Sequence, residues 1–232
     1  MLTEGTIIIP LKERQRIYTY VAALKSFASK LFTDGPLQPK IVIDKLNTDF
    51  TPTWDKKVGK HLATIKFDYD KDKARGKYYN QTSSIYLNLM YLGNARASKD
   101  GILLSGIDYP TLTVVLLHEY AHYKRDMKIR SKQYGWSLQT KDHGDDKKSY
   151  LRDPDEKLAF AAGYIETLRQ LIPGIEPQEI LARLRNSGLM HDPHLKKLKQ
   201  EDLPTWKAIM KYAIQTALHD IDSEKKSVTP LS

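Results

Sequence analysis

The chain has 232 residues, no cysteine and a formal net charge of +9. Without cysteine, disulfide frameworks, cysteine-ligated zinc ribbons and cysteine nucleophiles are excluded, so a metal site would have to use histidine and carboxylate ligands. No stretch approaches 18 apolar residues, and the start of the chain lacks the basic segment and apolar core of a signal peptide. We therefore expect a cytoplasmic protein without a membrane span, and its incorporation into a larger particle stays open.

The N-terminal half of the sequence predicts one helix and a small sheet. Apolar residues recur with helical spacing over residues 12–32, and Asp34-Gly35-Pro36 ends that helix. Residues 95–109 are expected to connect the sheet to the next helix. The strands are predicted at residues 40–46, 62–69, 77–80 and 84–89, the last two paired as a hairpin.

The next predicted helix contains the pattern with the clearest chemistry. His118-Glu119-Tyr120-Ala121-His122 reads H-E-x-x-H and lies in an apolar stretch with a typical helix start. Residues four apart lie on one face of a helix, so both imidazoles can bind one metal ion, whereas Glu119 points beside it. There the glutamate can take a proton from a metal-activated water, as a zinc hydrolase requires. Two surface histidines on an amphipathic helix are the alternative interpretation.

A catalytic zinc site needs a third protein ligand, and Glu156 is the predicted one. It lies in the first turn of a predicted helix that begins at Pro154, and the small residues Ala159 and Gly163 follow on the same face. Small residues there would let this helix approach the histidine helix closely. Lys128 stands where the metzincin class has its third histidine, so that class is excluded.

These two motifs resemble those of the gluzincin branch of zinc metallopeptidases. The resemblance covers about residues 60–172, and its second part is a Pro-x-Glu-x-x-Ala-x-x-Ala-like string that begins at Pro154. It implies a zincin-like fold and one catalytic Zn²⁺ bound by the two histidines and Glu156. It also implies a strand before the first metal helix that pairs with the substrate backbone.

Two alternatives to the Glu156 ligand stay open. Asp153 and Glu156 have the spacing of a capping box, in which the glutamate binds the backbone amide of the cap residue and needs no metal. His143, followed by Gly144, resembles the third ligand of SprT-like metallopeptidases, which act on DNA-bound proteins. Those proteins often have a cysteine zinc ribbon, which this chain lacks, and the acidic residues around His143 favour a solvated loop.

The C-terminal part of the sequence predicts a helical addition. Pro173-Gly174 breaks the helix that carries Glu156, and a short helix is predicted at 177–185. A last helix is predicted at 203–221, and residues 223–232 are expected to be a disordered tail.

Together these elements predict an α+β protein with a zincin-like metallopeptidase domain. The domain is expected over residues 1–174, with an N-terminal helix, a sheet of three or four strands and two metal-binding helices, followed by the helical addition over 175–222. The predicted function is a zinc-dependent endopeptidase with Glu119 as the general base. If the strand at 84–89 lies at the sheet edge, it would bind the extended backbone of a protein or peptide substrate.

Two other functions are compatible with the sequence. A zincin scaffold that binds zinc without turnover would be a binding or structural protein, although such a protein has no need for Glu119. The net charge of +9 permits weak contact with nucleic acid or an acidic partner, as a SprT-like protein would require. Interleaved acidic residues and the absence of a nucleic-acid-binding motif favour a solvated surface instead. The sequence does not indicate the substrate, the oxyanion-stabilising residue, an inhibitory segment or the oligomeric state.

Overall fold

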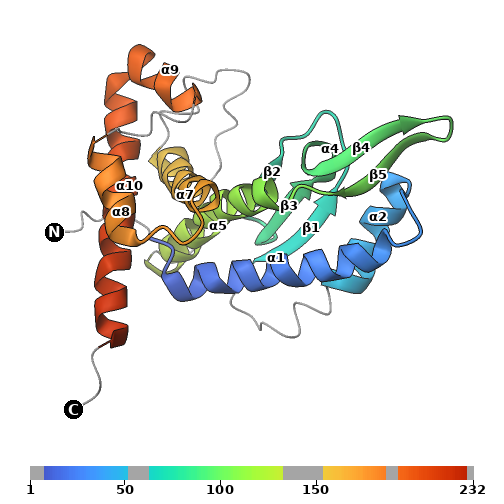
Figure 1. The fold of residues 1–232 in the computed structure, drawn as a ribbon, viewed down its shortest axis with the longest axis horizontal. Helices are drawn as coiled ribbons and strands as arrows, with labels where there is room; N and C mark the ends of the chain where they lie inside the picture. Colours follow the sequence, from blue (N-terminus) through green and yellow to red (C-terminus); the bar gives the residue numbers. More distant parts are fainter. Residues whose placement is uncertain (1–7, 52–62, 133–153, 187–192, 229–232) are drawn as a thin grey trace. The chain divides into compact units, whose positions relative to one another are not determined.

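The fold is given by a computed structural model that describes residues 8–51, 63–132, 154–186 and 193–228 (Figure 1). Its helices and small sheets belong to the predicted α+β class. The chain divides into two compact units, which we name the sheet unit, residues 14–138, and the helical unit, residues 1–13 and 139–232. Within the described ranges, none of the helices combines the length and the apolar character needed to cross a membrane.

The sheet unit contains both small sheets and the helices that surround them. Its predicted N-terminal helix is confirmed, because Ile17, Val21 and Leu24 are buried on one side of it. The helical segments are α1 (Leu11–Leu31), α2 (Pro39–Lys45), the π-helical turn η1 (Leu46–Phe50), α4 (Leu89–Leu92) and α5 (Tyr109–Lys132). The strands are β1 (Thr64–Asp68), β2 (Gly76–Tyr79), β3 (Ser84–Asn88), β4 (Gly93–Ser98) and β5 (Gly101–Ile107).

The first three strands form one sheet in the order β1-β3-β2. β3 is parallel to β1 and antiparallel to β2, which confirms the predicted hairpin between β2 and β3. The condition that residues 84–89 lie at the sheet edge is not met, because β1 occupies the other side of β3 and makes it the central strand. Ile85 and Leu87 are fully buried, as expected of a strand flanked on both sides. β1 and β2 are therefore the two edge strands, and β2 is the antiparallel one.

The strand predicted at residues 40–46 is also wrong. This segment is α2, which starts with Pro39 in its first turn and continues into η1. Val42 and Leu46 are buried one helical turn apart, whereas Ile41 is 47% exposed. The three β-branched residues of this stretch suggested a strand, but their burial follows the helical period because α2 packs against β5.

The predicted connection at residues 95–109 contains a second sheet instead. β4 and β5 form a two-stranded antiparallel ribbon that extends away from the three-stranded sheet (Figure 1). Gly101 takes a positive φ of 100° in the turn, a conformation that glycine adopts without strain. Leu37 exchanges backbone hydrogen bonds with Leu104 of β5 in both directions, which holds the ribbon to the segment before α2.

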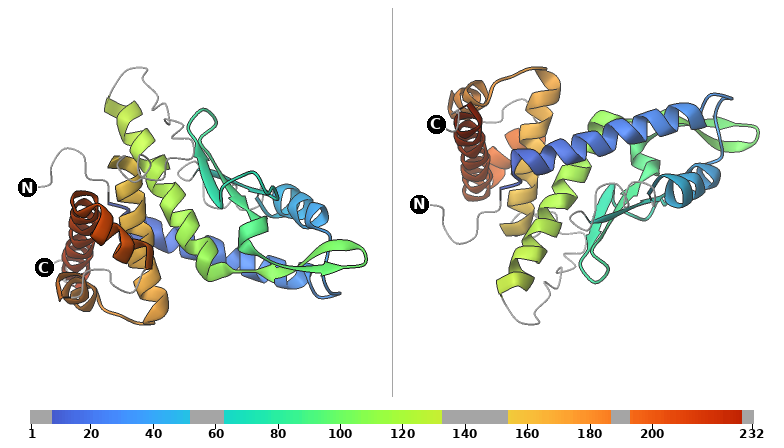
Figure 2. Two further views of the ribbon diagram at one scale, coloured as in Figure 1. Left: turned by 90° about the horizontal axis from the view of Figure 1, so that it is seen from above. Right: turned by 90° about the horizontal axis from the view of Figure 1, so that it is seen from below.

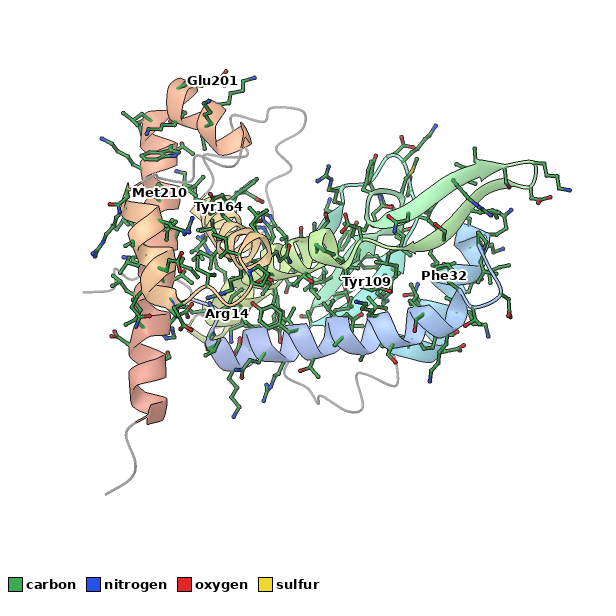
Figure 3. The ribbon with its side chains drawn as sticks, viewed as in Figure 1. Arg14, Phe32, Tyr109, Tyr164, Glu201 and Met210 are labelled. Carbon is green, nitrogen blue, oxygen red and sulfur yellow. The ribbon has the colours of Figure 1, made fainter. Side chains whose placement is uncertain are left out.

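The helical unit is built around a long C-terminal helix. Its elements are α7 (Pro154–Leu171), α8 (Pro177–Asn186), α9 (Pro193–Glu201) and α10 (Leu203–Val228). α10 packs against the other three, and the shared apolar core includes Ile180 of α8. Tyr164 of α7 and Met210 of α10 belong to the same core (Figure 3). A 2.7 Å ion pair between Arg169 Nη2 and Asp220 Oδ2 also links α7 to α10.

Helices α7, α8 and α10 confirm predicted helices, but α10 ends later than predicted. α7 and α8 lie where the sequence places them, and α9 was not predicted. α10 does not stop at residue 221 but continues to Val228, so the tail expected over 223–232 is wrong for its first part, and residues 229–232 lie outside the described ranges. The Ser223 hydroxyl donates a hydrogen bond to the carbonyl of His219, one turn earlier, and after Pro204 neither glycine nor proline occurs until Pro230.

Candidate metal centre

Helix α5 carries the predicted histidine pair and begins where the sequence indicates. The Asp108 carboxylate accepts hydrogen bonds from the Thr111 backbone N–H at 3.2 Å and from its hydroxyl at 2.7 Å, so Asp108 is the N-cap. Pro110 fits the first turn, because a backbone N–H at that position would have no intrahelical partner and its absence costs nothing. The helix packs against β2 and β3 of the three-stranded sheet (Figure 2).

His118 and His122 lie one turn apart on α5, and both are half-buried. Their Nε2 atoms are 3.3 Å apart and their ring planes meet at 70°. Two nitrogens bound to one tetrahedral zinc at about 2.0–2.1 Å would be separated by about 3.3–3.4 Å. The pair therefore already has the spacing of two ligands on one ion, a distance that a hydrogen bond between the rings could also span.

Glu119 lies between the two histidines in sequence but points toward the sheet. Its side chain is 8% exposed, and its Oε2 accepts a 2.8 Å hydrogen bond from the backbone N–H of Tyr78 on β2. The carboxylate is therefore held at the edge strand beside the histidine pair, and not among the ligands.

Two residues of β2 and one of α5 support this arrangement, and the sequence analysis did not identify them. A Cβ atom on Gly76 would lie 2.9 Å from Glu119 Cγ, so glycine permits the close approach of α5 to the strand. The Tyr78 hydroxyl donates a 2.7 Å hydrogen bond to Asp126, which is buried. A glycine inside a predicted strand is a known signal of close backbone approach, and Asp126 follows His122 by one turn, so both features could have been noticed.

Glu156 lies in the first turn of α7 and is half-buried. Among the described residues, the two histidines and Glu156 offer donor atoms of the kinds that could hold a metal ion. The histidines belong to the sheet unit and Glu156 to the helical unit. Asp153 and His143 lie outside the described ranges, so the capping-box and SprT-like alternatives stay predictions.

We compared the chain with protein-family models, with curated proteins and with solved structures, and none of the three comparisons found a match. The gluzincin resemblance therefore rests on the motif residues themselves. Function is inferred here from the chemistry and geometry of those residues.

Proposed function

We propose that the protein is a zinc-dependent endopeptidase in which His118, His122 and Glu156 bind one zinc ion. The observation that carries the proposal is the 3.3 Å separation of the two histidine Nε2 atoms, which suits two ligands of one tetrahedral ion. Imidazole nitrogen and carboxylate oxygen are both zinc ligands, and three protein ligands leave one position open for water or substrate. A histidine helix packed on a small sheet with an antiparallel edge strand supports a zincin-like fold.

Glu119 is the proposed general base and acid. When bound, zinc would supply Lewis acidity toward the water and the substrate carbonyl. Glu119 accepts one proton from the water as the water oxygen bonds to the carbonyl carbon. It then gives that proton to the amine nitrogen as the carbon–nitrogen bond breaks. The burial of Glu119 and its hydrogen bond to Tyr78 support this role, because they keep the carboxylate close to one position.

The proposed substrate is an extended segment of a protein or peptide. β2 lies at the edge of the sheet, and an extended chain can add to an edge strand through backbone hydrogen bonds. The N–H of Tyr78 already donates to Glu119, so a peptide bound along β2 would pair with other backbone groups of this strand and would lie beside the base. Backbone hydrogen bonds do not depend on the side chains of the substrate, so we expect cleavage to depend only modestly on the substrate sequence.

Metal content tests the ligand set. We expect one zinc per chain in the wild type, and loss of zinc in His118→Ala and in Glu156→Ala, measured by elemental analysis after purification without chelators. His143→Ala serves as the matched control and should retain its zinc. Loss of zinc in His143→Ala with retention in Glu156→Ala would replace the proposed third ligand by the SprT-like one. A wild type that binds no zinc would overturn the metal site altogether.

Turnover tests the role of Glu119. Glu119→Gln keeps the shape of the side chain and a hydrogen-bond acceptor for Tyr78 but cannot take a proton. We expect it to retain zinc while its cleavage rate on an unfolded fluorescent protein substrate falls by about 10²–10⁴-fold, the usual contribution of general acid–base catalysis. Zinc binding without turnover in the wild type would favour a non-catalytic binding protein instead.

A further inference from the structure

Strand β2 contacts Glu119 at two alternate positions, Gly76 and Tyr78. We propose that β2 is the positioning element for the Glu119 carboxylate. In this arrangement the Tyr78 N–H fixes one carboxylate oxygen, and the absent side chain of Gly76 leaves space for the rest of the group. The catalytic consequence rests on the function proposed above, whereas the contact between β2 and Glu119 can be tested without any activity.

The Tyr78 N–H is a donor that cannot rotate away. A side-chain donor can change rotamer, but a backbone N–H in a paired strand has a fixed direction. The 2.8 Å bond to Glu119 Oε2 joins a neutral donor to a carboxylate, and both residues are buried, at 5% and 8% exposure. Charge-assisted hydrogen bonds of this kind are stronger than neutral ones, so this bond can determine where the carboxylate lies.

Gly76 is required at its position for space. A Cβ atom there would lie 2.5 Å from Val115 Cγ1, 2.9 Å from Glu119 Cγ and 3.1 Å from Glu119 Oε1. The first two distances are shorter than real carbon–carbon contacts, so an alanine would displace the Glu119 side chain, the Val115 side chain or the whole helix. The carboxylate thus lies between α5 and β2, with Oε1 near Gly76 and Oε2 on the N–H of Tyr78.

The side chain of Tyr78 fixes the strand along the helix. Glu119 and Asp126 are seven residues apart, which places them two turns apart on one face of α5. Tyr78 reaches both, because its backbone N–H bonds to Glu119 and its hydroxyl bonds to Asp126. Its ring also packs edge-on against Tyr123, with centroids 5.9 Å apart. A sliding or tilting of β2 against α5 would break at least one of these contacts.

Amide hydrogen exchange of the full-length, zinc-loaded protein, followed by NMR, tests the contact directly. We expect the Tyr78 amide to exchange slowly in the wild type and at least tenfold faster in Glu119→Ala. Glu119→Gln is the matched control, because its amide oxygen can still accept the bond and should preserve the protection. An unchanged Tyr78 exchange rate in Glu119→Ala would overturn the proposal, even if the protein proves to be an active peptidase.

Gly76→Ala separates positioning from packing. We expect its kcat to fall by roughly 10²-fold with KM and zinc content close to wild type, since small misplacements of a catalytic group cost about this much. Gly76→Ala/Val115→Ala removes the contact with Val115 but keeps the one with Glu119, so its stability should recover while kcat stays low. Gly106→Ala on β5, where the nearest atom to a Cβ is 3.4 Å away, is the control with unchanged kcat.

The outcomes distinguish the two proposals. Recovery of kcat in the double variant would show that Gly76 serves packing alone and would overturn the positioning role. Zinc binding without turnover in the wild type would instead refute the proposed function. In that case the exchange rate of the Tyr78 amide still decides whether β2 positions Glu119.

Discussion

At the scale of single residues, Tyr78 makes the most informative contacts in the sheet unit. Its hydroxyl donates to a carboxylate oxygen of Asp126, whose side chain is 1% exposed. Because Asp126 is buried, the phenol satisfies a group that would be costly to leave without a donor. Tyr78 also donates its backbone N–H to Glu119. Its side chain therefore contributes to stability, and its amide contributes to the proposed chemistry.

Tyr78→Phe should therefore lower the free energy of unfolding by about 1.5–3 kcal/mol, the usual value for a hydrogen bond to a charged group. Urea denaturation measures the change. Tyr86→Phe, on the half-buried outer face of β3, is the matched control and should stay within about 0.5 kcal/mol of wild type. Equal effects of the two substitutions would mean that the Tyr78–Asp126 bond contributes nothing to stability.

At the level of helices and strands, α5 and α10 have the same kind of N-terminal cap. Asp108 caps α5 through the N–H and hydroxyl of Thr111, and Asp202 caps α10 through the same two groups of Thr205. In both cases the carboxylate binds orphan donors of the first turn and complements the positive end of the helix dipole. The sequence predicts a typical helix start before the histidine pair, and the structure shows that Asp108 is the residue that caps it.

Asp108→Ala should reduce stability by about 0.5–2 kcal/mol, because it removes both hydrogen bonds of the cap. His118 lies beyond the first two turns of α5, so we expect the zinc content to stay at the wild-type value. Thermal or urea unfolding with parallel elemental analysis measures both quantities. Asp108→Asn keeps a capping oxygen and should lose much less stability, and a loss as large as that of the alanine variant would contradict the capping explanation.

The elements that were predicted wrongly share a physical cause. Residues 40–46 contain three β-branched residues, yet they form α2 because packing against β5 buries Val42 and Leu46 on a helical period. The residues of β4 are small or polar, and this segment is a strand only because β5 supplies its hydrogen-bond partners. Propensity describes one segment at a time, whereas these two segments take their structure from a neighbour.

At the scale of the whole molecule, the proposed ligands come from both compact units. The two histidines belong to the sheet unit and Glu156 to the helical unit, so zinc bound by all three would link the folding of the two. Binding to the native state alone adds about 4 kcal/mol of stability when free zinc is about a thousand times its dissociation constant.

Removal of zinc with a chelator should therefore lower the melting temperature of the wild type. Differential scanning calorimetry with and without zinc measures the shift, and Glu156→Ala should show a much smaller one at the same zinc concentration. His143→Ala provides the comparison and should respond like the wild type. If Glu156→Ala gained as much stability from zinc as the wild type, the helical unit would not contribute a ligand.

The sequence by itself determined the local part of the candidate site. The i, i+4 spacing of the histidines, the cap at Asp108 and the start of α7 before Glu156 are properties of single helices, so a pattern along the chain predicts them. The central position of β3, the edge position of β2 and the contacts of Gly76 and Tyr78 with Glu119 emerge from the folded structure alone. The Tyr78–Glu119 bond joins residues 41 apart in sequence. Contacts over such separations depend on how packed elements meet, and no local pattern encodes that geometry.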